Sequence, residues 1–89
     1  MYAVLVKVRI KSGRHDDAMR LLHANVVPDV KGAPGLVRGT WFGDTDTGHG
    51  LMVFQSADQA QHMAGMVSAG DDDPVEIQDV EVYEVNAEA

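Results

Sequence analysis

The sequence predicts a single α+β domain whose elements follow one another in the order β-α-β-β-α-β. Three observations support this prediction. Residues 2–10 alternate between two kinds of side chain, with the period of two that is typical of a strand. Residues 34–70 contain two strand-like runs, a polar turn between them and a capped helix. The length of 89 residues fits one domain, so residues 1–89 are treated as a single unit.

The first strand is expected over Tyr2–Ile10 and has two unlike faces. One face carries only apolar side chains, so we expect it to lie against the helices: Tyr2, Val4, Val6, Val8 and Ile10. The other face is mixed, because it combines two apolar residues with two cations: Ala3, Leu5, Lys7 and Arg9. Those cations need water, a bound anion or acidic partners on a neighbouring strand.

The first helix is expected over His15–Val27, where apolar residues recur at helical spacing. Asp16 and Asp17 stand in its first turn, where carboxylates interact favourably with the helix dipole. Pro28 lacks an N–H and cannot continue the helix without a kink. We therefore expect Pro28 to begin a separate short turn that ends at Lys31.

A β-hairpin followed by a helix is expected over the central stretch. Leu36–Gly43 and the apolar run Leu51–Phe54 read as strands, joined by the turn formers of 44–48. Ser56 and Gln59 have the spacing of a capping box at a helix start. Gly70 is expected to end that helix in the left-handed conformation.

The last strand is expected over Val75–Val85, with one irregularity. Its apolar positions are odd at Val75 and Ile77, and even at Val80 and Val82. A β-bulge near Gln78-Asp79, or a strand that leaves one sheet for another, produces such a slip. Residues 86–89 are expected to fray.

With right-handed crossovers, this order of elements gives the ferredoxin-like sandwich: a four-stranded antiparallel sheet of order 4-1-3-2 with two helices on one face. The opposite face is too apolar to be left in water. A chain this short also buries only about 60–65% of its unfolded surface. We therefore expect this face to pack on the sheet of a second copy, in a homodimer.

Composition and charge exclude several classes of protein. The net charge of −7 argues against binding to nucleic acid or to anionic membranes. No apolar run approaches the roughly 20 residues of a membrane span. Cysteine is absent, which rules out disulfides and thiolate chemistry. The N-terminus lacks the features of a signal peptide, so a cytoplasmic location is expected.

Four stretches carry a family resemblance: Pro34-Gly35, the hairpin DTDTGHG, the junction VFQSADQAQHM and the closing VEVYEV. Together they resemble the dimeric α+β barrel superfamily, and within it the antibiotic-biosynthesis-monooxygenase-like (ABM-like) domains. The resemblance implies two sheets paired in a barrel with helices outside. It also implies oxygenation of an aromatic substrate without metal or flavin, so no cofactor is expected.

A second branch of that superfamily degrades heme with an Asn, a Trp and a His. The corresponding positions here hold Val6 (or Lys7), Phe54 and Ala64, with His62 two residues away. We therefore do not expect heme degradation. No metal site is expected either, because His15 and His23 lack the i, i+4 spacing of a helical zinc pair, and turn chemistry accounts for the aspartates of 44–48.

The candidate site residues surround the junction of the second helix. His62 is the candidate catalytic base, although a boundary histidine with one wet edge explains it at least as well. Trp41, Tyr2 and Phe54 are the candidate substrate-binding walls, although a place in the core or in the dimer interface explains Trp41 better. The leading hypothesis is a homodimer that binds a small apolar or aromatic molecule, as a cofactor-independent monooxygenase. The alternative is a non-catalytic ligand-binding or structural dimer domain, in which the methionines 19, 63 and 66 fill the cleft.

Overall fold

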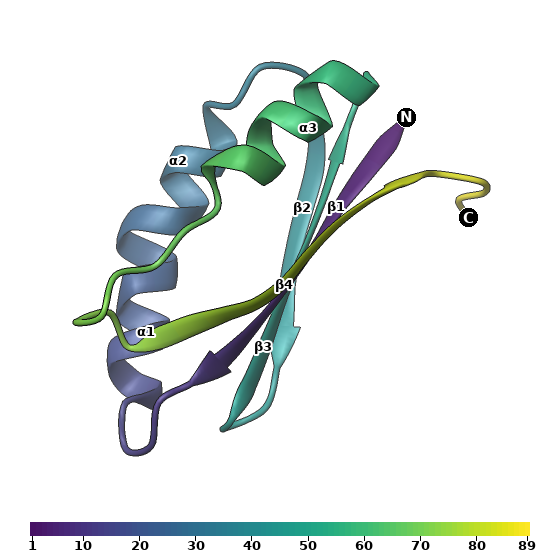
Figure 1. Ribbon diagram of the computed structural model, residues 1–89. Helices are drawn as coiled ribbons and strands as arrows, with labels where there is room; N and C mark the ends of the chain where they lie inside the picture. Colours follow the sequence, from purple (N-terminus) through teal and green to yellow (C-terminus); the bar gives the residue numbers. More distant parts are fainter.

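The protein has two layers, a twisted sheet and a layer of helices on one of its faces (Figure 1). The computed structural model describes all 89 residues. The elements, in chain order, are β1 (Tyr2–Ile10), α1 (His15–Leu21), η1 (Leu22–Val26), α2 (Val27–Lys31), β2 (Leu36–Gly43), β3 (Thr47–Phe54), α3 (Ala57–Met66) and β4 (Val75–Glu84).

The sheet has four antiparallel strands in the order β2-β3-β1-β4. Counted from the opposite edge, this is β4-β1-β3-β2. The α+β class, the antiparallel sheet and the helices on one face are compatible with a ferredoxin-like fold. The single chain contains one sheet, so the predicted pairing of two sheets in a barrel stays a prediction.

The core lies under the central strand β1. Val4, Val6 and Ile10 are buried on its helix-facing side, which confirms the prediction from alternation. Met52 and Phe54 of β3 join them, and Ala60 of α3 closes the cluster from above. Burying a side chain such as Phe54 contributes about 1.5–3 kcal/mol. We call the opposite side of the sheet the outer face.

The irregularity in the last strand is a β-bulge, as predicted. Lys7 pairs with Asp79 whereas Val8 pairs with Ile77, so Gln78 is the extra residue on β4. The strand stays in the one sheet on both sides of the bulge. Val80 and Val82 therefore pack against the core although Ile77 precedes them with the opposite parity.

The first helical segment differs from the prediction of a break at Pro28. It runs without interruption from His15 to Lys31 through the π-helical turn η1. The N–H of Val27 donates to the Leu22 carbonyl, one residue beyond the α-helical partner. In a regular α-helix the Pro28 ring would collide with the carbonyl four residues earlier. The wider π turn in front of Pro28 accommodates it without ending the helix.

The hairpin and the start of α3 follow the sequence closely, with one difference. The Asp44 carboxylate accepts hydrogen bonds from the N–H groups of Asp46 and Thr47, and β3 begins at Thr47, before the apolar run at Leu51. At the helix start, Ser56 Oγ accepts a hydrogen bond from the Gln59 N–H at 3.2 Å. The expected N-cap is therefore confirmed.

The second half of the capping box is not formed. The Gln59 side chain lies over Gly35, and its Oε1 is buried without a hydrogen-bond partner. Gly35 has a φ of 78°, and a Cβ on it would collide with the Gln59 amide. Glycine at this position thus meets two requirements at once, a left-handed backbone and close packing.

The end of α3 and the C-terminal residues also depart from expectation. The helix ends at Met66 with Val67 extended, and Gly70 does not adopt a positive φ. After β4, the Val85 N–H donates to the Met1 carbonyl, and the Glu88 carboxylate lies 2.5 Å from Arg38 of β2. The C-terminal segment therefore crosses the outer face from β4 to β2 instead of fraying.

The cap of α3 predicts a measurable loss of stability. Ser56→Ala removes the acceptor for the Gln59 N–H and should lower the free energy of unfolding by about 1 kcal/mol. Urea unfolding followed by Trp41 fluorescence measures it. Ser12→Ala is the matched control, because Ser12 is exposed in a turn. An equal effect of the two substitutions would contradict the capping role.

Candidate functional site

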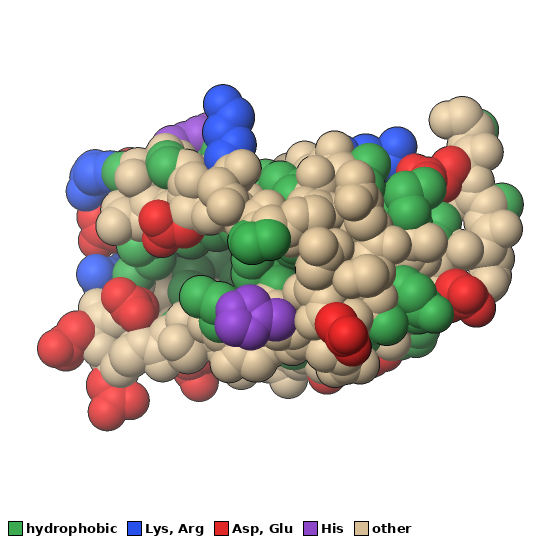
Figure 2. Space-filling model, turned by 90° about the horizontal axis from the view of Figure 1, so that it is seen from above, with side chains coloured by type: hydrophobic (Ala, Val, Ile, Leu, Met, Phe, Trp, Pro, Cys, Tyr) green, Lys and Arg blue, Asp and Glu red, His purple; other side chains and the backbone are tan.

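A cavity of about 430 Å³ lies between the sheet and the helices. Figure 2 shows it as a hollow walled by hydrophobic side chains. Of the 28 residues that line it, 18 are hydrophobic. A space with such walls favours the apolar part of a small molecule over water.

The cavity exists because two layers stand apart at one end of the sheet. There α3 packs on β1, β3 and β4, and α2 packs on β2, whereas α1 makes no comparable contact with the strands. On the floor, β3 has glycine at both helix-facing positions opposite Val8 and Val6, namely Gly48 and Gly50. The space stays open because the two glycines have no side chains to fill it and because α1 does not pack closely on the strands.

Trp41 forms one wall of this space. It pairs with Gly50 across β2 and β3, and its indole lies over Gly50 and over Gly39 of its own strand. A Cβ on Gly50 would lie 2.8 Å from the indole Nε1. The glycines therefore make room for the ring to lie along the sheet. The structure places Trp41 in the wall of this cavity.

The roof is built from flexible apolar side chains. Met19 and Leu22 come from the first helical segment, and Met63, Met66 and Val67 come from α3 and the residue after it. The methionines border the cavity without filling it, and Met66 keeps 63% of its surface exposed. Unbranched thioether side chains adapt to ligands of different shape.

The ionisable groups of the cavity are mainly carboxylates. Asp29, Asp44 and Asp73 line it, together with His15 and His49, and no Lys or Arg does. Hydrogen bonds from the Asp46 and Thr47 N–H groups hold the pKa of Asp44 below its usual range. This carboxylate is therefore ionised at neutral pH. Asp73 is half-buried and accepts a hydrogen bond from the Gly70 N–H at 2.7 Å.

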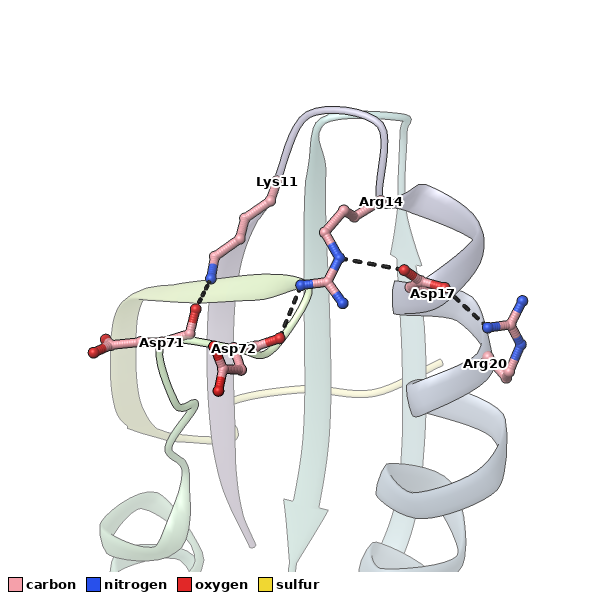
Figure 3. Close-up of polar contacts among 6 residues, drawn as sticks. All are labelled: Lys11, Arg14, Asp17, Arg20, Asp71 and Asp72. Carbon is pink, nitrogen blue, oxygen red and sulfur yellow. Dashed lines mark hydrogen bonds and ion pairs between the residues drawn. The ribbon is translucent and has the colours of Figure 1, made fainter.

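Two cationic side chains hydrogen-bond to the loop between α3 and β4, residues 67–74 (Figure 3). Lys11 Nζ donates to the Asp71 carbonyl at 2.5 Å, and Arg14 Nη1 donates to the Asp72 carbonyl at 2.8 Å. Arg14 also contacts Asp17, whose carboxylate binds Arg20, and these two arginines lower the pKa of Asp17. Because residues 67–69 of this loop line the cavity, the two cations hold part of the cavity wall in place.

The other predicted site residues lie apart from the cavity. His62 is exposed on α3 and does not line it. Tyr2 is half-buried against the core, and Phe54 is a core residue with 1% of its surface exposed. Of the four candidates, only Trp41 reaches the cavity.

Sequence reasoning missed Ala18, Gly48 and Asp73, which line the cavity. The sequence did contain one signal for Gly48, which alternates with Gly50 along one strand. Glycines in a strand often mark a place where another group approaches the backbone closely.

Comparison with known proteins finds no matching family model, no matching curated protein and no matching solved structure. None of the helices combines the length and the apolar character needed to cross a membrane.

The loop contacts predict a local effect on dynamics. Arg14→Met removes the donor to the Asp72 carbonyl and should speed amide hydrogen exchange of Gly70 and Asp73 several-fold, because the loop opens more often. Exchange measured by NMR tests this. Arg20→Met is the matched control, since Arg20 contacts Asp17 but not the loop. Equal exchange in both variants would show that Arg14 does not hold the loop.

Proposed function

We propose that this protein binds a small, largely apolar molecule in the cavity between its sheet and helices. The observation that carries the proposal is the cavity itself, about 430 Å³ with mainly hydrophobic walls. Sites for small molecules typically measure about 300–1,000 Å³ and combine apolar walls with a few polar groups. Here Asp73, His15 and Ser68 are among the polar groups.

The proposal is one of binding. Trp41 gives the cavity an aromatic wall, which suits planar ligands. The candidate base His62 lies outside the lining, so the proposal gives it no role. Oxygenation of an aromatic substrate, which the family resemblance implies, stays a prediction.

Filling the cavity should weaken binding. Ala18 is buried in the cavity wall on α1, and Ala18→Leu places a larger side chain there without reducing helix propensity much. Affinity for the neutral fluorescent probe N-phenylnaphthylamine should fall tenfold or more, about 1.4 kcal/mol. Fluorescence titration measures it, and circular dichroism checks that the variant is folded.

Ala24→Leu is the matched control, because Ala24 is exposed on the same helical segment and does not line the cavity. It should bind the probe as the unaltered protein does. A folded Ala18→Leu variant with undiminished affinity would place the probe elsewhere and contradict the proposal.

We further propose that the protein forms a homodimer through the outer face of the sheet. Leu5 and Leu51 pair across β1 and β3 on this face, and Phe42 remains 53% exposed beside them. Phe42 stacks on His49, with ring centroids 5.2 Å apart. These side chains form an apolar area that a second copy can cover.

The charges on the outer face also suit a twofold partner. Arg9 pairs with Glu76 within the chain, whereas Lys7 lies opposite Asp79 of β4, two residues before Glu81 on the same strand. The Asp79 carboxylate beside Glu81 raises the pKa of Glu81, so this strand carries two close negative groups. We expect the twofold axis to bring the basic side chains of one copy toward the acidic strand of the other.

Light scattering should therefore give about twice the chain mass of 9.6 kDa. Leu51→Lys should shift the protein to a monomer, because a buried cation without a partner destabilises an interface. Gln61→Lys adds the same charge on exposed α3 and should remain dimeric. A monomeric unaltered protein at micromolar concentration would contradict the dimer.

A further inference from the structure

Among the Asp, Glu, Lys and Arg side chains, only aspartates line the cavity. Asp29 of α2, Asp44 of the hairpin turn and Asp73 of the α3–β4 loop line it, and no Lys or Arg does. They come from three separate segments, so the negative charge surrounds the space instead of belonging to one loop. Asp73 is half-buried, so its charge acts on a ligand in the apolar cavity more strongly than a fully hydrated charge does.

The cations at this end of the molecule offset only part of this negative charge. Lys11 and Arg14 donate to backbone carbonyls of Asp71 and Asp72, and Arg14 and Arg20 share Asp17 (Figure 3). The backbone N–H of Ile10 donates to the Asp46 carbonyl, and the backbone N–H of Lys11 donates to the Pro74 carbonyl. These hydrogen bonds bring residues 10–20, 44–47 and 71–75 together. Seven aspartates and three cations occupy these ranges. The cavity therefore opens at a strongly acidic end of the molecule.

From the apolar walls and this excess of carboxylates, we propose that the cavity is selective for hydrophobic amines, molecules with an apolar body and one protonated amino group. This inference rests on the proposed function. The apolar body occupies the space beside Trp41, and the ammonium group lies toward Asp73. Asp73 suits this role because it is half-buried and one of its oxygens is already oriented by the Gly70 N–H. Anions of the same shape, such as aromatic carboxylates, are repelled.

Three probes with one hydrocarbon body test the selectivity: naphthylmethylamine, naphthalenemethanol and naphthoate, each titrated into the full chain by calorimetry at neutral pH. The amine should bind about fivefold more tightly than the alcohol, as one partly exposed ion pair allows. Naphthoate should bind more weakly than the alcohol. Added salt should reduce the preference for the amine, because it screens the carboxylates.

Asp73→Asn keeps the acceptor for the Gly70 N–H and removes the charge. It should bring the amine close to the alcohol in affinity and leave the alcohol unchanged. Asp58→Asn is the matched control: it removes one charge from exposed α3, outside the cavity lining, and should preserve the preference. An equal loss in both variants would assign the effect to net charge and overturn the role of Asp73.

The outcomes separate this inference from the proposed function. If the alcohol binds but the amine binds no tighter, or naphthoate binds best, the selectivity is overturned and the apolar cavity stands as a site. If none of the three probes binds, the proposed function fails and this inference fails with it.

Discussion

The strict alternation along β1 is the constraint on which the rest of the structure depends. β1 is hydrogen-bonded on both edges, to β3 and β4, so its two faces are fixed by its neighbours. Val4 and Val6 can be buried under the helices only in one register. The same register places Leu5 and Lys7 on the outer face. A core on one side and a mixed, half-apolar surface on the other are thus consequences of a single strand.

Local rules explain why much of the fold could be predicted from the sequence. Alternation identified β1, Ser56 marked the start of α3, and the change of parity after Ile77 indicated an irregularity near Gln78-Asp79, which is a bulge. The helix through Pro28 could not be predicted, because its π turn depends on where the whole segment must end. The C-terminal segment was likewise unpredictable, since a contact between Arg38 and Glu88 joins distant parts of the chain.

The cavity was beyond sequence reasoning for a related reason. The cavity forms because α1 stands away from the sheet and because Gly48 and Gly50 have no side chains to fill the space below it. The residues chosen from the sequence were large or titratable, and of these only Trp41 lines the space. A cavity also lowers stability, because its walls lose packing partners. In so small a domain, the contacts of Lys11 and Arg14 with the adjoining loop offset part of that loss.

The central position of β1 has a consequence for how the chain folds during synthesis. β1 leaves the ribosome first, but its partners on the two edges, β3 and β4, emerge only near residues 54 and 84. Until β3 is made, both edges of this apolar strand are unpaired, and until β4 is made, one edge remains open to other chains. The hairpin of β2 and β3 can form early by itself, whereas β1 becomes a central strand only when β4 is present. Shortening the chain before β4 would therefore leave one edge of β1 available to pair with other chains.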